Sequence, residues 1–346
     1  MSFSPRKIQT LFLAVTLLFA GALGWLGWRL VQQDRALARQ RRVEQLEAAA
    51  DRVSAAVYRR LADFEEALAD PVHGRLPAGA VLLRASREGI EARPPNGLLY
   101  YPAVPASPEP PPGVFSKAET AEFQRNDPAA AAEAYRPLTR SADPAVRAAA
   151  LLGLARNLAK SNRASEALRA FDQLAAMGAA RVGGLPADLV ALEARCSLLE
   201  KLARHADLDR EAHVLYAKLT DGHWLLLRAS YDFKLEEARG WLGRAPDPAQ
   251  LEERAAPSAA AGTLWNDWLR EPVSKGRRFF IAEGPPVLAA WVSSAQELTA
   301  VLAPAAALAP ALGEADGFHA RMISGYRRAA IGSMLLRSPG NSSPLQ

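Results

Sequence analysis

An uncharged segment near the N-terminus constrains this chain more than any other feature. The sequence holds 21 consecutive residues without a charge from Ile8 to Trp28, and basic residues flank them on both sides. At a rise of about 1.5 Å per residue, such a helix spans about 30 Å, the thickness of the apolar part of a bilayer. We therefore predict a tail at residues 1–7 and a transmembrane helix at residues 8–31.

A cleaved signal peptide is the alternative interpretation of this segment. Residues 20–22 have the small side chains of a cleavage site, but cleavage there would leave Trp25 and Trp28 on an exposed apolar N-terminus. Tryptophan beside arginine is typical of the end of a spanning helix, so we favour the uncleaved anchor. The downstream arginines would hold the long domain in the cytoplasm, but long domains are exported regardless of flanking charge. Charge alone therefore leaves the orientation open.

The composition excludes one class of partner and limits the chemistry. The formal charge is +5 and the arginines are scattered, with no basic stripe interleaved with aromatic residues, so we expect no nucleic-acid binding. The single cysteine, Cys196, cannot form a disulfide within the chain. It lies in an apolar helical run, where we expect a small buried side chain.

Residues 32–70 are predicted to form a long amphipathic stalk helix. Apolar side chains recur there at a mean spacing of about 3.6 residues, between a coiled-coil seam and an ordinary amphipathic helix. They are Val43, Leu46, Ala50, Val53, Val57, Leu61, Phe64 and Leu68. The pattern fits a stalk that packs on its own domain, and it also fits a parallel homodimer.

Residues 71–116 are predicted to form a β-hairpin and a proline-rich connector. Residues 81–83 and 98–101 have the composition of short strands, and residues 94–97 carry a turn signal between them. Residues 102–113 contain six prolines, so we expect an extended connector there.

Residues 117–243 are helical in pattern and repeat a spacing. A small residue, an aromatic residue four positions later and a leucine recur 36 residues apart, at 131–138 and 167–174, and once more at 212–219. The small residue lets two helices approach, and the aromatic ring fills the groove between them. The residues assigned to this packing are Leu151, Leu154, Ala155, Leu158, Ala167, Phe171, Leu174, Ala131 and Tyr135.

These residues resemble the tetratricopeptide repeat, whose period is near 34 residues. The best copy runs from Leu151 to Leu174. The first copy departs from the pattern because Glu119 and Glu122 stand where apolar residues are expected, and the third is displaced by nine residues. The resemblance implies stacked helical hairpins.

The C-terminal part is predicted to be a linker at 244–262, a small α/β cap at 263–336 and a disordered tail at 337–346. Residues 278–282 and 287–291 are expected to form a hairpin across Gly284, and the earlier strands could complete the sheet. The remaining expectations are a short helix with Trp265 and Trp268, a helix at 295–302 and a second hairpin at 318–333.

No residue pattern for catalysis, cofactor binding or metal binding is recognisable. The phosphate-binding loop, the nucleophile elbow and the zinc-protease motif are missing from the sequence. The histidines lack ligand spacing on one helical face; they are His73, His205, His213, His223 and His319. We therefore predict no catalytic residue, no cofactor and no metal.

The order of parts resembles the extracytoplasmic input region of bacterial sensor histidine kinases. The resemblance rests on Gln33–Leu37, Ala48–Val53, Leu98–Pro102, Phe123, Asp127–Pro128 and Ala320–Ile323. It implies a sensory domain outside the cytoplasmic membrane. The phosphoacceptor box and ATP-binding boxes of such kinases are absent from the sequence, so we expect the sensory part alone.

The predicted fold is mainly α, with one N-terminal transmembrane helix, a stalk helix, tetratricopeptide-like hairpins and a small α/β portion. The leading functional hypothesis is a non-enzymatic, membrane-anchored sensory domain in the inner membrane, with most of the chain periplasmic. The alternative is an anchored scaffold that recruits a protein partner through its helical repeats. An envelope hydrolase comes third, because no nucleophile or metal constellation supports it.

Overall fold

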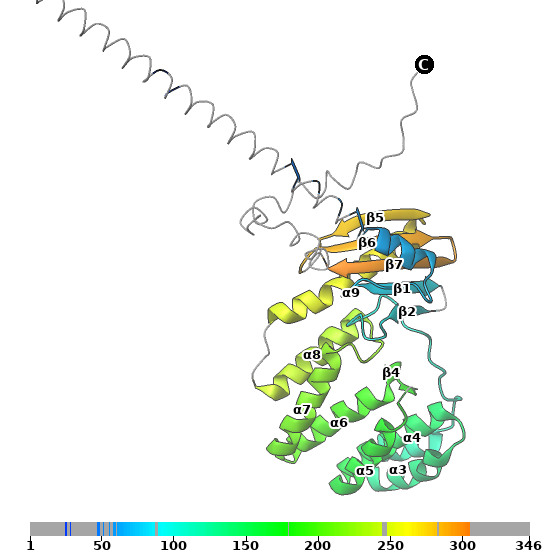
Figure 1. Ribbon diagram of the computed structural model, residues 1–346. Coiled ribbons are helices and arrows are strands. Elements are labelled where there is room, and N and C mark those ends of the chain that lie inside the picture. The colour runs from blue at the N-terminus through cyan, green and yellow to red at the C-terminus, as the bar shows by residue number, and fades with distance from the viewer. Residues whose placement is uncertain are drawn as a thin grey trace, which may run out of the picture. The chain divides into compact units, whose positions relative to one another are not determined.

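The computed structural model describes residues 61–304, except for 87–88, 179, 244–247 and 282–283, together with isolated positions between 25 and 59. The chain divides into two compact units, and Leu61–Leu308 forms one of them. This unit is mainly helical with a small sheet portion (Figure 1). The predicted second hairpin and C-terminal tail lie outside the described residues.

The predicted membrane location is contradicted by the described part of the chain. None of its helices is both long enough and apolar enough to cross a membrane. A spanning helix needs about 20 apolar residues in succession, whereas the 23-residue helix α9 (Pro248–Arg270) carries charges at Glu252, Glu253 and Arg254. Residues 8–31 other than Trp25 and Trp28, and most of the stalk, lie outside the described residues, but residues 61–69 are helical.

The sheet has five antiparallel strands, of which two precede the helical repeats in the sequence and three follow them. Its order is β2 (Ile90–Arg93), β1 (Val81–Ser86), β7 (Glu297–Pro304), β6 (Val287–Ser293) and β5 (Lys275–Phe280). The earlier strands therefore complete the C-terminal sheet, as expected, because β1 pairs with β7. The predicted hairpin across Gly284 is confirmed, because β5 pairs with β6.

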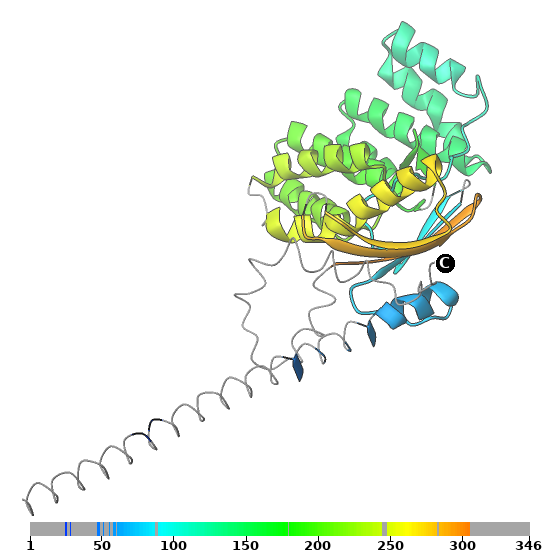
Figure 2. The same cartoon turned by 90° about the horizontal axis from the view of Figure 1, so that it is seen from above.

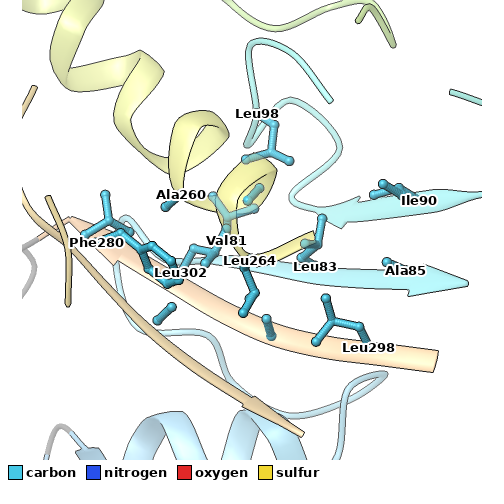
Figure 3. Packing of buried hydrophobic residues seen from close by; sticks show 14 of the residues in the cluster. Val81, Leu83, Ala85, Ile90, Leu98, Ala260, Leu264, Phe280, Leu298 and Leu302 are labelled. Carbon is cyan, nitrogen blue, oxygen red and sulfur yellow. The ribbon is translucent and has the colours of Figure 1, made fainter. Parts of the chain in front are cut away.

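Helix α9 covers one face of this sheet and residues 61–69 cover the other (Figure 2). The core under α9 contains alternate residues of β1, such as Val81 and Leu83, together with Ala260 and Leu264 of the helix (Figure 3). The opposite face buries the intervening residue Leu82, and Phe64 of the other helix is buried as well. Burial on both faces fixes the register of the interior strands β1 and β7, because a shift of one residue would exchange the two faces of the strand.

Two predictions in this region were wrong. Residues 295–302 are not helical, because all but the first two of them belong to the interior strand β7. An interior strand with both faces buried is a continuous apolar run, which periodicity cannot separate from a buried helix. Residues 248–262 are not a linker but the first part of α9, in which alanines of high helix propensity surround Pro257.

Successive helices of the repeat region pack as hairpins. In chain order they are α2 (Ser116–Glu119), the π-helix η1 (Thr120–Gln124), α3 (Pro128–Tyr135), η2 (Arg136–Arg140), α4 (Pro144–Lys160), α5 (Ala164–Ala175), α6 (Ala187–Lys201), α7 (His205–Thr220) and α8 (Arg228–Leu242). Two short strands, β3 (Arg181–Val182) and β4 (Leu185–Pro186), connect α5 to α6. Residues of positive φ mark three of the turns within hairpins, at Asn126, Asn162 and Ala203.

The segment predicted as a second strand, residues 98–101, joins the sheet to the helical repeats instead. Leu98 and Tyr101 belong to the core under α9, whereas Leu99 and Tyr100 belong to the core built from α6, α7 and α8. The buried Oγ of Ser258 in α9 accepts hydrogen bonds from the backbone N–H groups of Leu99 at 2.8 Å and Tyr100 at 3.3 Å. We call residues 98–101 the joint.

Replacing Ser258 tests the joint. The substitution Ser258→Ala removes the buried oxygen that accepts from the N–H groups of Leu99 and Tyr100, so we expect it to lower the free energy of unfolding by about 1–3 kcal/mol. Urea titration followed by near- and far-ultraviolet circular dichroism measures this loss. The control Ser197→Ala, at a half-buried position of α6, should change stability by less than about 0.5 kcal/mol. Equal stability of both variants would contradict a structural role for Ser258.

Candidate functional site

A buried carboxylate joins the first two helical hairpins. Glu122 lies in η1, and its side chain is only 1% exposed. One carboxylate oxygen accepts from Arg156 Nε at 2.7 Å and Lys160 Nζ at 2.8 Å. The other accepts from Arg156 Nη2 at 2.6 Å and Asn157 Nδ2 at 2.8 Å. These four residues are called the polar junction.

The polar junction keeps Glu122 ionised despite its burial. Burial raises the pKa of Glu122, but hydrogen bonds from Arg156, Lys160 and Asn157 outweigh that effect and hold the pKa at about 2. The departure of Glu122 from the repeat pattern is therefore compensated by donors 34 to 38 residues later in the chain. One carboxylate facing two cations leaves the junction with an excess positive charge.

An exposed aromatic ring, that of Phe123, lies close to both of these cations. Phe123 is 66% exposed, and its ring centroid lies 5.7 Å from the Arg156 guanidinium carbon and 6.0 Å from Lys160 Nζ. Both cations are about half exposed. Leu152 is half-buried and lies four residues before Arg156, on the same face of α4. The Phe123 patch consists of Phe123, Leu152, Arg156 and Lys160.

All nine residues assigned to repeat packing are buried in the structure. All of them except Ala131 belong to one core built from α2 to α6. The ring of Tyr135 lies against Gly153 of α4, where a Cβ atom would approach the ring to 2.6 Å. The ring of Tyr135 therefore fills the space beside Gly153, a residue that has no side chain.

The third copy of the repeat has a different register from the predicted one. Helices α5 and α7 begin 41 residues apart, at Ala164 and His205, so Leu208 rather than Ala212 corresponds to Ala167. The β3–β4 connection supplies the extra length. The same offset relates Ala155 to Cys196, which is fully buried, and burial raises the pKa of this thiol to about 12. The prediction of a small buried residue at Cys196 is confirmed.

A second polar cluster lies between α6 and α8. Lys234 Nζ contacts the carboxylate of Glu193 and lies 3.0 Å from Glu237 Oε2. Burial, followed by the hydrogen bond with Glu237, raises the pKa of Glu193 to about 7. Trp241 Nε1 also donates to Glu200 Oε2 at 3.2 Å across the same two helices. Polar side chains therefore link α6 to α8.

The sequence reasoning missed both polar clusters, since their members are far apart in the chain. No group of three or more potential metal ligands occurs among the described residues. The described histidines do not gather; His223, for example, packs edge-on against Trp224, with ring centroids 5.2 Å apart. Comparison of the chain with protein-family models, curated proteins and solved structures gives no match.

The substitution Glu122→Gln tests the polar junction. The amide removes the negative charge that holds Arg156 and Lys160, so we expect a loss of about 1–3 kcal/mol in unfolding free energy at pH 7. The wild-type contribution is present above pH 4.5 and is lost as the pH falls towards the folded pKa of about 2. Urea titrations between pH 3 and 7 should show the two proteins converging in acid. The exposed Glu119→Gln control should show no such pH-dependent difference.

The Glu193 cluster predicts the opposite pH dependence. A folded pKa of about 7, raised from 4.5, adds stability that is complete below pH 4.5 and is lost as the pH rises through 7. We expect Glu193→Gln to flatten the fall in unfolding free energy between pH 5 and 7, which is at most about 1.4 kcal/mol per pH unit for one proton. The exposed Glu236→Gln variant is the control. Identical slopes in wild type and Glu193→Gln would refute the assignment.

Proposed function

We propose that this chain is a non-enzymatic protein-binding module. Its stacked helical hairpins, similar to tetratricopeptide repeats, recruit a protein partner through the Phe123 patch. The observation that carries the proposal is the exposure of Phe123 beside two cations, Arg156 and Lys160, whose positions are fixed by their hydrogen bonds to Glu122.

The chemistry of the patch selects the partner. Aromatic and arginine side chains dominate the binding energy of protein interfaces, and Phe123 and Arg156 supply both types. The polar junction restrains Arg156 and Lys160 before binding, which lowers the conformational entropy lost in the complex. The excess positive charge favours a segment that offers carboxylates beside an apolar side chain. The partner class is therefore an acidic protein segment.

A sensory role is the second proposal, and the joint favours it. The side chains of residues 98–101 lie in two cores: Leu99 and Tyr100 in the core of α6 to α8, and Leu98 and Tyr101 in the core between the sheet and α9. A partner that shifts the helical hairpins would thereby disturb β1 and β7. Hydrogen exchange of the amides in these strands should slow or quicken on partner binding, and unchanged exchange would count against signal transfer.

The substitution Phe123→Ala tests the binding proposal. On an array of acidic peptides that each contain one apolar residue, we expect at least a tenfold loss of affinity, about 1.4 kcal/mol, with unfolding free energy unchanged. The matched control is Phe233→Ala, because Phe233 is also exposed, at 58%, and also lies beside a lysine, Lys234.

Two results would contradict the proposal. One is an array on which the wild-type chain binds no acidic peptide. The other is a set of peptides whose affinity falls with Phe233→Ala but not with Phe123→Ala.

A further inference from the structure

Strand β5 forms an open edge of the sheet: within the described part of the chain it pairs with β6 alone (Figure 1). One hydrogen bond shows which residues of β5 bond to β6. Ser293 N donates to Ser274 O at 2.8 Å, and these residues lie opposite each other because Lys275 is paired with Val292.

That contact determines which backbone groups of β5 face outward. In an antiparallel pair, hydrogen-bonded and non-hydrogen-bonded positions alternate along each strand. Because Ser274 bonds to β6, the even-numbered residues 276, 278 and 280 do so as well. The N–H and C=O groups of Lys275, Arg277 and Phe279 therefore point to the open edge, where another strand could accept and donate in turn.

The side chains of these three residues define one chemical surface. They lie on the same face of the sheet, since successive side chains alternate, and on the face opposite Phe280, which packs under α9. Within the described part of the chain, neither Lys275 nor Arg277 has a carboxylate at ion-pair distance, whereas Arg278 pairs with Asp267.

Apolar side chains extend this surface at both ends. Ile281, directly after β5 and in phase with Phe279, is 74% exposed, and Val292, opposite Lys275, is also exposed. Among the described residues, the edge thus offers backbone groups without a strand partner, two cations without a counter-ion, and apolar contacts.

We propose that the β5 edge binds an extended acidic segment of a partner protein as an additional antiparallel strand. Backbone hydrogen bonds to residues 275, 277 and 279 supply the pairing, and alternate side chains supply the specificity. Carboxylates of the segment face Lys275 and Arg277, and an apolar side chain faces Phe279. This surface is separate from the Phe123 patch, so the inference does not depend on the function proposed above.

The same charges argue against a second copy of this chain as the occupant. Two-fold antiparallel pairing of two β5 strands about Arg277 would place the two Arg277 side chains directly opposite each other, and like charges in that position are destabilising. Basic side chains also protect an exposed edge from association with identical chains. The edge therefore disfavours its own copy and favours an acidic strand.

Two synthetic peptides and the full chain test this proposal. The probe is Thr-Phe-Thr-Glu-Thr-Glu-Thr, blocked at both ends, and its matched control carries lysine in place of both glutamates. Isothermal titration at physiological salt should show at least tenfold tighter binding of the glutamate peptide. Equal binding of the two peptides, or no binding of the glutamate peptide at millimolar concentration, would overturn the proposal.

Backbone pairing is tested by methylating one amide nitrogen at a time, which leaves the protein unchanged. Methylation of a glutamate amide, which faces β5, should abolish binding, and methylation of the threonine between the glutamates should not. If both methylated peptides bind equally well, the added strand is refuted.

A charge reversal on the protein locates the site. The variant Arg277→Glu should lose at least tenfold in affinity for the glutamate peptide and should prefer the lysine peptide. The control Arg270→Glu, at the exposed end of α9, should bind as the wild type does. An Arg277→Glu variant that keeps its preference for the glutamate peptide would exclude β5 as the site.

Discussion

The hydrogen bonds from the backbone of Leu99 and Tyr100 to Ser258 fasten helix α9 to the segment that joins the sheet to the helical hairpins. The joint has no repeating pattern of its own, because its side chains alternate between two different cores. The backbone N–H groups of Leu99 and Tyr100 find their acceptor in Ser258 of α9, whereas that of Tyr101 donates to the carbonyl oxygen of Leu226 at 2.8 Å. Gly222 allows the close approach: with φ near +71°, a Cβ atom there would lie 2.5 Å from the carbonyl oxygen of Leu98. The helical hairpins and the sheet can therefore influence one another through four residues.

The polar junction shows how a buried charge is tolerated between two hairpins. An isolated carboxylate in a core would be neutralised or would destabilise the fold, but Glu122 receives four hydrogen bonds from one face of α4. The same hydrogen bonds restrain Arg156 and Lys160, the two cations beside Phe123 at the surface. The buried carboxylate of Glu122 thus fixes the positions of the two cations in the Phe123 patch at the surface.

The parts of the fold that could be predicted are those whose signal is local. The Ala131–Tyr135 and Ala167–Phe171 spacings indicated helical hairpins, and the two apolar runs on either side of the Gly-Pro-Pro turn at residues 284–286 indicated the β5–β6 hairpin. Strand β7 was misassigned because burial on both faces removes the alternation that marks a strand. The first part of α9, residues 248–262, was misassigned as a linker because its composition is rich in proline and alanine. The joint and the polar junction could not be predicted, since the partners of Leu99 and Glu122 lie 159 and 34 to 38 residues away.

Photo-cross-linking from position 123 tests the central claim most directly. A photoreactive phenylalanine analogue in place of Phe123 reports what occupies the patch when the full chain meets its natural partners, and mass spectrometry identifies the attached segment. The account predicts cross-links to an acidic segment of a protein, absent when the same analogue replaces the comparably exposed Phe233. Cross-links from position 233 alone, or from neither position, would contradict the claim that the Phe123 patch is the binding surface.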